Sequence, residues 1–181
     1  MSDEQLMINY RDGQAAAFDA LYERHKGGLY RYFLRQLNNR ADISSELFQD
    51  VWMKLINARH KYQPSAKFTT YLYHLAHKRL IDHWRSEKHI NEQVEYEDTL
   101  QSNASEPHEA LQQMQTKLQI KQAIAELPEE QRSAILLKEE GALSLSEIAE
   151  ITGVNRETVK SRLRYAVNRL KGALHPLRSV S

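Results

Sequence analysis

The sequence predicts an all-α protein of two small helical domains joined by an acidic flexible linker, with a helix-turn-helix in the C-terminal domain. Three observations support this fold class. Only four prolines and six glycines occur in 181 residues, too few for an all-β protein that turns about every dozen residues. Apolar residues recur at steps of three and four, as the buried face of a helix requires. One internal stretch is acidic and poor in branched apolar residues, which separates two packed units.

The N-terminal domain is predicted to span residues 1–90, where three helical stripes occur. Apolar residues at helical spacing run over residues 18–37, and a second stripe covers residues 47–56. A third helix is expected from about residue 67 to about residue 87, with its apolar residues on one side. Pro64 indicates a loop before this third helix.

Residues 91–111 are predicted to form the linker. The stretch from residue 91 to residue 117 contains six acidic residues and one basic residue, and a cluster of Ser, Asn and Pro occupies residues 102–107. Such a composition has little apolar surface to bury, so it favours a solvated tether between two packed domains.

The C-terminal domain, residues 112–181, contains two short helices separated by about four residues around a glycine. Ser144 with Glu147 three residues later forms a capping box for the first of these helices. Asn155 is a preferred N-cap for the second, and Gly153 between them tolerates the positive φ of a chain reversal. This arrangement is typical of a helix-turn-helix, in which the second helix lies in the major groove of DNA.

The positive charge of this domain is concentrated on that second helix. From Arg156 onward the chain has seven basic residues and one acidic residue, whereas residues 118–155 have three basic and seven acidic ones. A charged helix face is usually only solvated surface, but here the charge, the capped short helix and the glycine turn all agree with DNA binding. The apolar side predicted to pack on the domain consists of Val159, Leu163, Ala166, Val167 and Leu170. The residues predicted to lie nearest to the DNA are Arg156, Glu157, Thr158, Lys160, Ser161, Arg164 and Tyr165.

Whole motifs of the chain resemble the bacterial sigma-70 family of RNA polymerase sigma factors, and in particular its compact extracytoplasmic-function (ECF) group. Region 4 of that family is similar to the stretch LPEEQRSAILLKEEGALSLSEIAEITGVNRETVKSRL. Region 2 is similar to SSELFQDVWMKL followed by FTTYLYHLAHKRLIDHWR. The match covers roughly residues 15–90 and 112–172. The resemblance implies a factor that binds core RNA polymerase, directs it to promoters and helps to open the duplex.

The resemblance also implies site residues and partners. The N-terminal domain would bind the β′ coiled coil of core polymerase through Glu46, Gln49, Asp50 and Trp52. It would read the minus-ten promoter element, as bases of a melted strand, through Tyr62, Tyr71, His74, Lys78 and Arg85. The C-terminal domain would read the minus-thirty-five element with the helix described above, next to the β flap of the polymerase. An anti-sigma protein is a further implied partner.

Several of these residues have a simpler interpretation. Positions 46, 49 and 50 share a helix face, but Glu46 and Asp50 could be ordinary exposed acids, with Lys54 as the partner of Asp50. Tyr62 could pack on its own domain instead of stacking on a base. A stand-alone helix-turn-helix regulator is the alternative function, and it explains the C-terminal domain equally well. It does not explain the region 2 motifs.

An enzyme, a metal site and a membrane protein are not expected. The chain has no cysteine, no Gly-rich phosphate loop and no nucleophile elbow. His74 and His77, three residues apart, could supply two metal ligands, but no carboxylate is placed convincingly as a third, so we expect no metal and no cofactor. The longest apolar runs reach four residues, and the N-terminus has acids where a signal peptide has bases. The sequence therefore predicts a cytoplasmic protein without direct membrane insertion.

Overall fold

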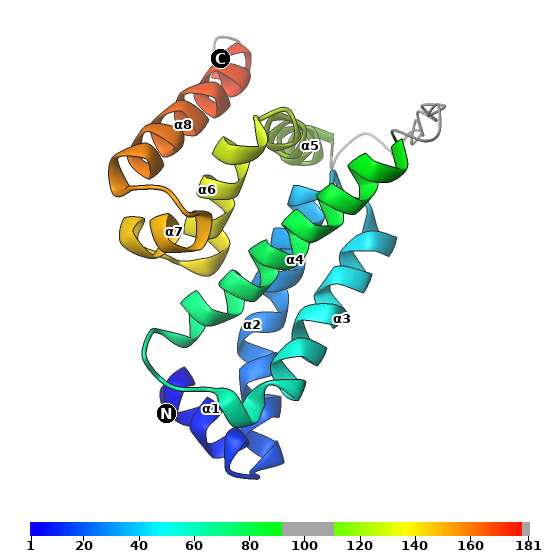
Figure 1. The fold of residues 1–181 in the computed structure, drawn as a ribbon. Coiled ribbons are helices and arrows are strands. Elements are labelled where there is room, and N and C mark those ends of the chain that lie inside the picture. Colours follow the sequence, from blue (N-terminus) through cyan, green and yellow to red (C-terminus); the bar gives the residue numbers. More distant parts are fainter. Residues whose placement is uncertain (92–110, 179–181) are drawn as a thin grey trace.

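The computed structural model describes residues 1–91 and 111–178, with side chains for residues 1–90 and 114–174. Within these ranges the regular elements are eight α-helices and one short 3-10 helix, without a strand, which confirms the all-α class (Figure 1). The first unit contains α1 (Asp3–Arg11), α2 (Ala15–Gln36), α3 (Ala41–Asn57), η1 (Arg59–Lys61) and α4 (Phe68–Asn91). The second contains α5 (Leu111–Ala125), α6 (Glu129–Gly141), α7 (Leu145–Thr152) and α8 (Arg156–Arg178). Residues 92–110, which make up most of the predicted acidic linker, lie outside the described residues.

The first unit is built on three long helices, α2, α3 and α4, which pack side by side (Figure 1). Their facing sides bury the apolar stripes that the sequence predicts, because that is how an amphipathic helix removes its apolar side from water. Side chains without solvent exposure at this contact include Leu21, Leu29, Phe33, Leu47, Leu55, Leu72 and Leu80. The short helix α1 was not predicted, since only Leu6 and Met7 of its nine residues are buried and too few apolar positions remain to show a period.

The second unit confirms the predicted helix-turn-helix. Ser144 and Glu147 make both hydrogen bonds of the capping box that opens α7, at 3.2 and 2.9 Å. Gly153 ends α7 with a φ of 73°, and the Asn155 side chain accepts a hydrogen bond from the Thr158 amide at 2.8 Å at the start of α8. These caps are local, so the sequence alone sufficed to predict them.

The buried side of α8 agrees with the prediction at most positions. Val159, Leu163 and Ala166 are buried and belong to the apolar core. Val167 is the exception, because 37 % of this residue is exposed. The turn of about 100° between successive helix residues carries it away from the contact that covers Ala166.

The two units pack against each other, with α6 on α2 and α7 on α4 (Figure 1). The Glu140 carboxylate at the end of α6 accepts hydrogen bonds from Arg31 Nε at 3.0 Å and Arg35 Nη1 at 2.7 Å. The Tyr73 hydroxyl donates to the Glu140 carbonyl at 3.1 Å. Gly28 permits this close approach, since a Cβ on it would lie 3.2 Å from that carbonyl oxygen and 3.0 Å from the Tyr73 hydroxyl.

A second group of polar contacts continues this interface. The Gln36 side chain donates to Ser133 Oγ at 2.9 Å and accepts from Arg132 Nε at 3.0 Å. Gln36 and Ser133 are both buried, and their hydrogen bonds offset the cost of removing them from water. Arg132 also lies over the Trp84 ring at 5.8 Å. The contact between the units is therefore rich in hydrogen bonds and charge pairs.

Candidate nucleic-acid and protein interfaces

The first candidate surface is the α8 face, which we define as the predicted DNA-contacting residues of α8. Arg156, Lys160 and Arg164 are exposed on its first turns, whereas Thr158 and Ser161 are half-buried. The Arg164 guanidinium lies over the Tyr165 ring at 5.5 Å, and Tyr165 is itself 53 % exposed. The structure thus brings cations, short hydroxyls and one aromatic ring together on one exposed helix end. Such a set can bind phosphates and base edges.

The neighbouring Arg162 does not belong to this surface. It is 20 % exposed, and its Nη2 lies 3.6 Å from a Glu130 carboxylate oxygen of α6. This ion pair joins α8 to α6. Figure 1 shows α8 on the side of the second unit that faces away from α2 and α4.

The second candidate surface is the α4 face, formed by Tyr71, His74, Lys78 and Arg85. These positions are three, four and seven residues apart, so they lie on one side of α4. His74, Lys78 and Arg85 are exposed, and Tyr71 is half-buried. The face therefore presents one aromatic ring, one imidazole and two cations along a single line.

His77 lies elsewhere, although helical spacing in the sequence groups it with His74 on the polar side of this helix. Its Nδ1 lies 3.2 Å from the hydroxyl of the fully buried Tyr32. Burial, with a smaller contribution from His74, lowers the pKa of His77 to about 4. The uncharged imidazole is thus part of the packing between α4 and α2, and the prediction for this residue was wrong because Tyr32 of α2 packs against this position.

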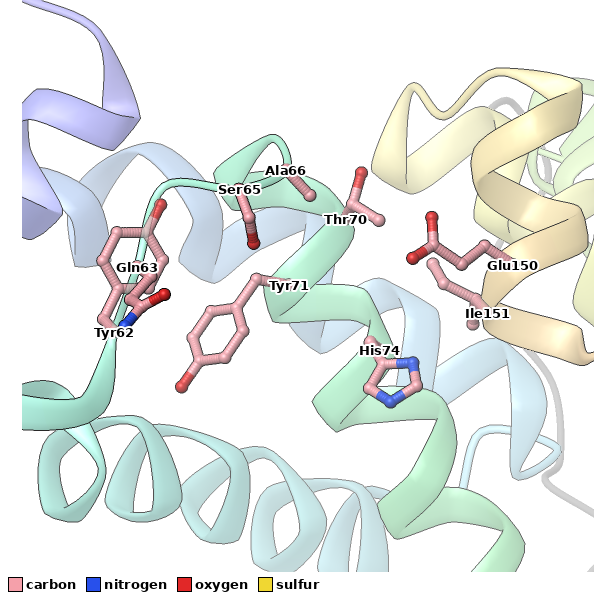
Figure 2. A pocket seen from close by; sticks show the side chains of 9 residues that line it. All are labelled: Tyr62, Gln63, Ser65, Ala66, Thr70, Tyr71, His74, Glu150 and Ile151. Atoms are coloured by element: carbon pink, nitrogen blue, oxygen red, sulfur yellow. The ribbon is translucent and has the colours of Figure 1, made fainter.

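A pocket of about 180 Å³ opens at the start of the α4 face (Figure 2). Loop residues between η1 and α4 form one wall and the first turns of α4 form another. The residues that line it are Tyr62, Gln63, Ser65, Ala66, Thr70, Tyr71, His74, Glu150 and Ile151. A cavity of roughly 150 Å³ can hold a benzene molecule, so this pocket is of a size to accept an aromatic ring.

Tyr62 forms a wall of this pocket and is only 4 % exposed. Its ring packs edge-on against Tyr71, with centroids 5.3 Å apart. Burial raises the pKa of Tyr62 to about 12, so the hydroxyl stays protonated. In this arrangement Tyr62 packs on its own domain, and Tyr71 is the more exposed of the two rings. The hydroxyls of Tyr62 and Thr70 have no hydrogen-bond partner among the described residues.

The second unit closes the far side of the pocket. Glu150 and Ile151 of α7 line it, and Figure 2 shows their side chains across from His74 and Thr70. Nearby, a Glu147 carboxylate oxygen lies 3.4 Å from Lys67 Nζ. The sequence did not predict that α7 would contribute to this site, because nothing local in LSEIAEIT indicates a contact with a loop 80 residues earlier.

The third candidate surface is the α3 face, which we define as Glu46, Gln49 and Asp50. Glu46 and Gln49 are exposed, and Asp50 is half-buried. Asp50 Oδ2 accepts a hydrogen bond from Arg79 Nε of α4 at 3.0 Å, so its partner is Arg79 and not Lys54. An acidic and amide surface of this kind suits a basic protein partner.

Trp52 does not reach this surface, which corrects its assignment as a contact residue. It is 4 % exposed and lies in an aromatic cluster, with ring centroids 5.7 Å from Phe18 and 5.2 Å from Tyr22. Trp52 therefore packs α3 against α2 and so holds the helix that carries the α3 face in place. The contact role came from the resemblance alone, since helical periodicity places Trp52 beside the apolar stripe of residues 47–56.

A groove beside the α3 face was missed by the sequence argument. It has a volume of about 380 Å³ and is lined by Tyr22, Lys26, Gly27, Tyr30, Ser45, Phe48 and Gln49. Its aromatic residues had been counted as core because they fall on the apolar stripes. The apolar stripes did not show that these aromatic side chains are only half-buried. The groove offers apolar edges and an amide to a protein partner.

The described residues contain no group of three or more His, Cys, Asp or Glu side chains suited to a metal ion. None of the described helices combines the length and the apolar character that a membrane crossing requires.

Comparisons with known proteins identify the two units. A family model described as Sigma-70 region 2 matches residues 21–90, and one described as Sigma-70, region 4 matches residues 117–170. The ECF RNA polymerase sigma factor RpoE of Cereibacter sphaeroides is 34% identical over 170 residues, which covers 92% of this chain and 91% of that protein. The ECF RNA polymerase sigma factor SigW of Bacillus subtilis is 27% identical over 179 residues, with coverage of 92% and 94%.

A solved structure has the same fold. The sigma factor RpoE of Bartonella quintana, determined in complex with the anti-sigma factor NepR, superposes with a TM-score of 0.68 at 23% sequence identity. The match covers 87% of this chain and 96% of that one. The two family models and the identity to a curated ECF factor over nine-tenths of both chains agree with the helical architecture, and the chain belongs to the ECF group of the sigma-70 family of RNA polymerase sigma factors.

Proposed function

We propose that the two domains of this sigma factor have different tasks. The protein is a transcription initiation factor and not an enzyme, and it directs RNA polymerase to promoters. The first domain, residues 1–90, binds core polymerase and reads the minus-ten element during duplex opening. The second, residues 112–181, reads the minus-thirty-five element, and residues 91–111 join the two. The observation that carries this proposal is the presence of three exposed faces with different chemistry on two separate units.

In the proposal the α8 face enters the major groove of the minus-thirty-five element. Arg156, Lys160 and Arg164 are exposed at the start of α8, where a recognition helix meets base edges and phosphates. Glu157 is exposed beside them and can accept a hydrogen bond from a cytosine amino group. The short side chains of Thr158 and Ser161 leave room for the backbone of α8 to approach the DNA.

The α4 face and its pocket would hold bases of the melted minus-ten strand. A single flipped base fits a cavity that takes one aromatic ring, and Tyr71 offers a half-exposed ring for stacking. His74 lines the same pocket and supplies a hydrogen-bonding edge. Lys78 and Arg85 continue along the same side of α4, where they can follow the phosphates.

The α3 face and the aromatic groove beside it would dock the β′ coiled coil of core polymerase. Glu46, Gln49 and Asp50 supply the acidic and amide groups, while Tyr22, Tyr30 and Phe48 supply apolar area. Trp52 contributes indirectly, because it packs α3 against α2. Arg79 holds Asp50 in the free chain, so a basic group of the polymerase has to compete with this ion pair or join it.

We also propose that this protein works in the cytoplasm and that an anti-sigma protein binds it. The support for such a partner is the likeness of the fold to a sigma factor solved in complex with the anti-sigma factor NepR. The β flap of the polymerase is the proposed contact of the second domain.

Transcription in vitro tests this function. Core polymerase with the purified chain should initiate at promoters selected from a random library, whereas a stand-alone regulator cannot replace an initiation factor. Reversing Asp50 to Lys should weaken core binding by roughly 2 to 5 kcal/mol if the contact is desolvated. Asp19→Lys, at an exposed acid of α2, is the matched charge reversal and should bind core normally. Equal binding of core polymerase by both variants would reject the α3 face as the docking surface.

A further inference from the structure

The loop of residues 62–67 connects η1 to α4 and forms the outer wall of the pocket beside the α4 face. After Tyr62, the residues from Gln63 to Lys67 are all exposed. A segment with so little buried surface is held mainly by what fixes its ends, because its interior makes few packing contacts. What holds the two ends therefore decides the shape of the pocket.

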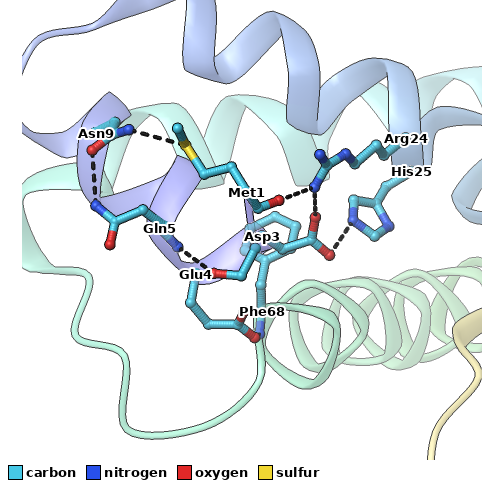
Figure 3. A network of polar contacts seen from close by, with 9 residues as sticks. Met1, Asp3, Glu4, Gln5, Asn9, Arg24, His25 and Phe68 are labelled. Carbon is cyan, nitrogen blue, oxygen red and sulfur yellow. Dashed lines mark hydrogen bonds and ion pairs between the residues drawn. The ribbon is translucent and has the colours of Figure 1, made fainter.

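Both ends of this loop are held by the same short helix, α1. Arg11 Nη1 donates a hydrogen bond to the Tyr62 carbonyl at 3.2 Å, at the start of the loop. At the other end, the Phe68 amide donates to Glu4 Oε1 at 2.8 Å, and Figure 3 places the Glu4 side chain beside Phe68. Glu4 and Arg11 are seven residues apart, so they lie on one side of α1 about two turns apart.

Glu4 supplies a cap that the local sequence does not provide. The first amides of a helix have no partner within the helix and are usually satisfied by Ser, Thr, Asp or Asn at the preceding position. The residue before Phe68 is Lys67, which has no side-chain acceptor. The carboxylate of Glu4 fills this role from 64 residues away, and its negative charge suits the positive end of the α4 dipole.

α1 is itself fixed to the first unit, so it can act as a rigid spacer. Met7, which lies between Glu4 and Arg11 on the same side of the helix, is fully buried. Asp3 accepts a hydrogen bond from Arg24 at 2.9 Å, and its other oxygen lies 2.8 Å from His25 Nε2, both on α2 (Figure 3). The spacing between the two loop ends is thereby set by the length of α1.

We propose that Glu4 and Arg11 are positioning residues of the base pocket, through which α1 sets the loop of residues 62–67 and the Tyr62 wall relative to Tyr71 and His74. The inference rests on the proposed reading of the minus-ten strand by this pocket. α1 precedes residue 21, where the match to sigma-70 region 2 begins, so base discrimination depends on a helix outside the matched segment.

The test uses holoenzyme and a fluorescent single-stranded oligonucleotide that carries the minus-ten sequence selected in vitro by the wild-type factor. Four versions of the oligonucleotide differ only at the base that the wild-type holoenzyme discriminates most strongly. In Glu4→Ala and Arg11→Ala holoenzymes, the ratio of affinities between the preferred and the other bases should fall roughly fivefold, as expected for one lost hydrogen bond. Glu4→Gln keeps a side-chain oxygen and should retain most of the wild-type ratio.

Arg40→Ala is the matched control, since it removes an ion pair with Glu87 in the same unit but contacts neither α1 nor the loop. It should lower the melting temperature while leaving the base ratio unchanged. Binding to a duplex minus-thirty-five element should be the same for all variants, which reports that the chain is folded. Unchanged base ratios in both alanine variants, or an equal loss in Arg40→Ala, would overturn the positioning role. A wild-type holoenzyme without base preference would instead reject the pocket as a base site.

Discussion

The two surfaces proposed to read DNA differ in how far the rest of the chain covers them. On the α8 face, Arg156, Lys160 and Arg164 are exposed to solvent. Beside the α4 face, the pocket is closed on one side by Glu150 of α7, and Glu147 of the same helix pairs with Lys67 at 3.4 Å. The first helix of the helix-turn-helix, α7, thus covers part of the surface beside the α4 face. The α8 face, on the second helix, stays open to solvent.

If the α4 face and the α8 face read the minus-ten and minus-thirty-five elements as proposed, the described arrangement cannot bind both elements at once. The minus-ten and minus-thirty-five elements are centred roughly 25 base pairs apart, which is about 85 Å at 3.4 Å per base pair. Only three residues separate α7 from α8, and α7 packs on α4. Even the whole of α8 is only about 35 Å long at 1.5 Å per residue. The two units have to separate before both elements are bound.

The chemistry of the contact between the units is consistent with such a separation. Its central groups, Glu140, Gln36 and Ser133, make hydrogen bonds that water can replace when the units part. A contact made only of large apolar side chains would expose a hydrophobic patch on opening.

The largest expected effect is a loss of stability of the first unit in acid. The pKa of His77 is about 4 in the folded chain because burial disfavours the cation, against about 6.5 for an exposed histidine. Between these values the unfolded chain binds a proton that the folded chain does not. Stability should therefore fall as the pH decreases from about 6.5 to about 4, by about 3 kcal/mol, and it should not change for this reason above pH 6.5.

Urea unfolding at several pH values measures this effect. His77→Gln should remove most of the slope, and His60→Gln, at an exposed histidine, should retain it. The described side chains of residues 114–174 include no histidine, so the second unit should not share this dependence. A slope of the same size in His77→Gln would assign the acid sensitivity to other groups.

The second effect is the opening of the two units when Glu140 is replaced by Ala. The Glu140 side chain is 7% exposed, and its two arginine partners are part-exposed. After allowance for solvent screening at the arginines, the contact should weaken by about 2 kcal/mol, or about 30-fold in the ratio of closed to open chains. The free protein should then bind the single-stranded minus-ten oligonucleotide more tightly, with no change at the α8 face.

Because the chain has no cysteine, two labels can report this opening directly. Cysteines at the exposed positions Asn57 and Lys171 would place spin labels on α3 and α8. Glu140→Ala should broaden the measured distances to longer values, and Glu139→Ala, at an exposed neighbour, should not. Identical distance distributions in the two variants would show that Glu140 does not hold the units together.

A smaller effect is expected at the open surface. Arg164 is exposed on α8, so Arg164→Ala should cost about 1 to 2 kcal/mol of discrimination at particular base pairs if it reads a base. If it contacts a phosphate, all sequences should lose affinity alike and the dependence on salt should become shallower. Affinity for the minus-thirty-five duplex, measured with its single-base variants at several salt concentrations, separates these cases. Arg162→Ala is the comparison, since this arginine pairs with Glu130 and should alter stability more than discrimination.

The smallest effect concerns the start of α7. Ser144→Ala removes one of the two capping-box hydrogen bonds, and the free energy of unfolding of the second unit should fall by about 1 kcal/mol. Ser146→Ala, at an exposed serine two residues later, should have little effect. Thermal unfolding of the two variants provides the measurement. A larger loss for Ser146→Ala would contradict the assigned cap.

Local features of the structure were predictable from the sequence because their partners lie within one helical turn. The capping box of Ser144 and Glu147, the N-cap Asn155 and the glycine turn at Gly153 all depend on residues three or four positions apart. The buried stripes of α2, α3 and α4 follow from helical periodicity in the same way. Charge counts along the chain, which need no coordinates, indicated the basic α8.

Only the tertiary structure decided the features that join distant parts of the chain. His77 was misplaced because a helical pattern gives the angle of a side chain around its helix but not what packs on that side. Trp52 was misplaced because the resemblance implied a contact role, whereas its ring packs on Phe18. The cap of α4 by Glu4 and the closing of the pocket by Glu150 join residues more than 60 positions apart. Such contacts depend on how the helices pack, which a single sequence does not specify by spacing. The sequence thus determined the long helices and which faces are charged, and the packing of those helices determined which faces are covered.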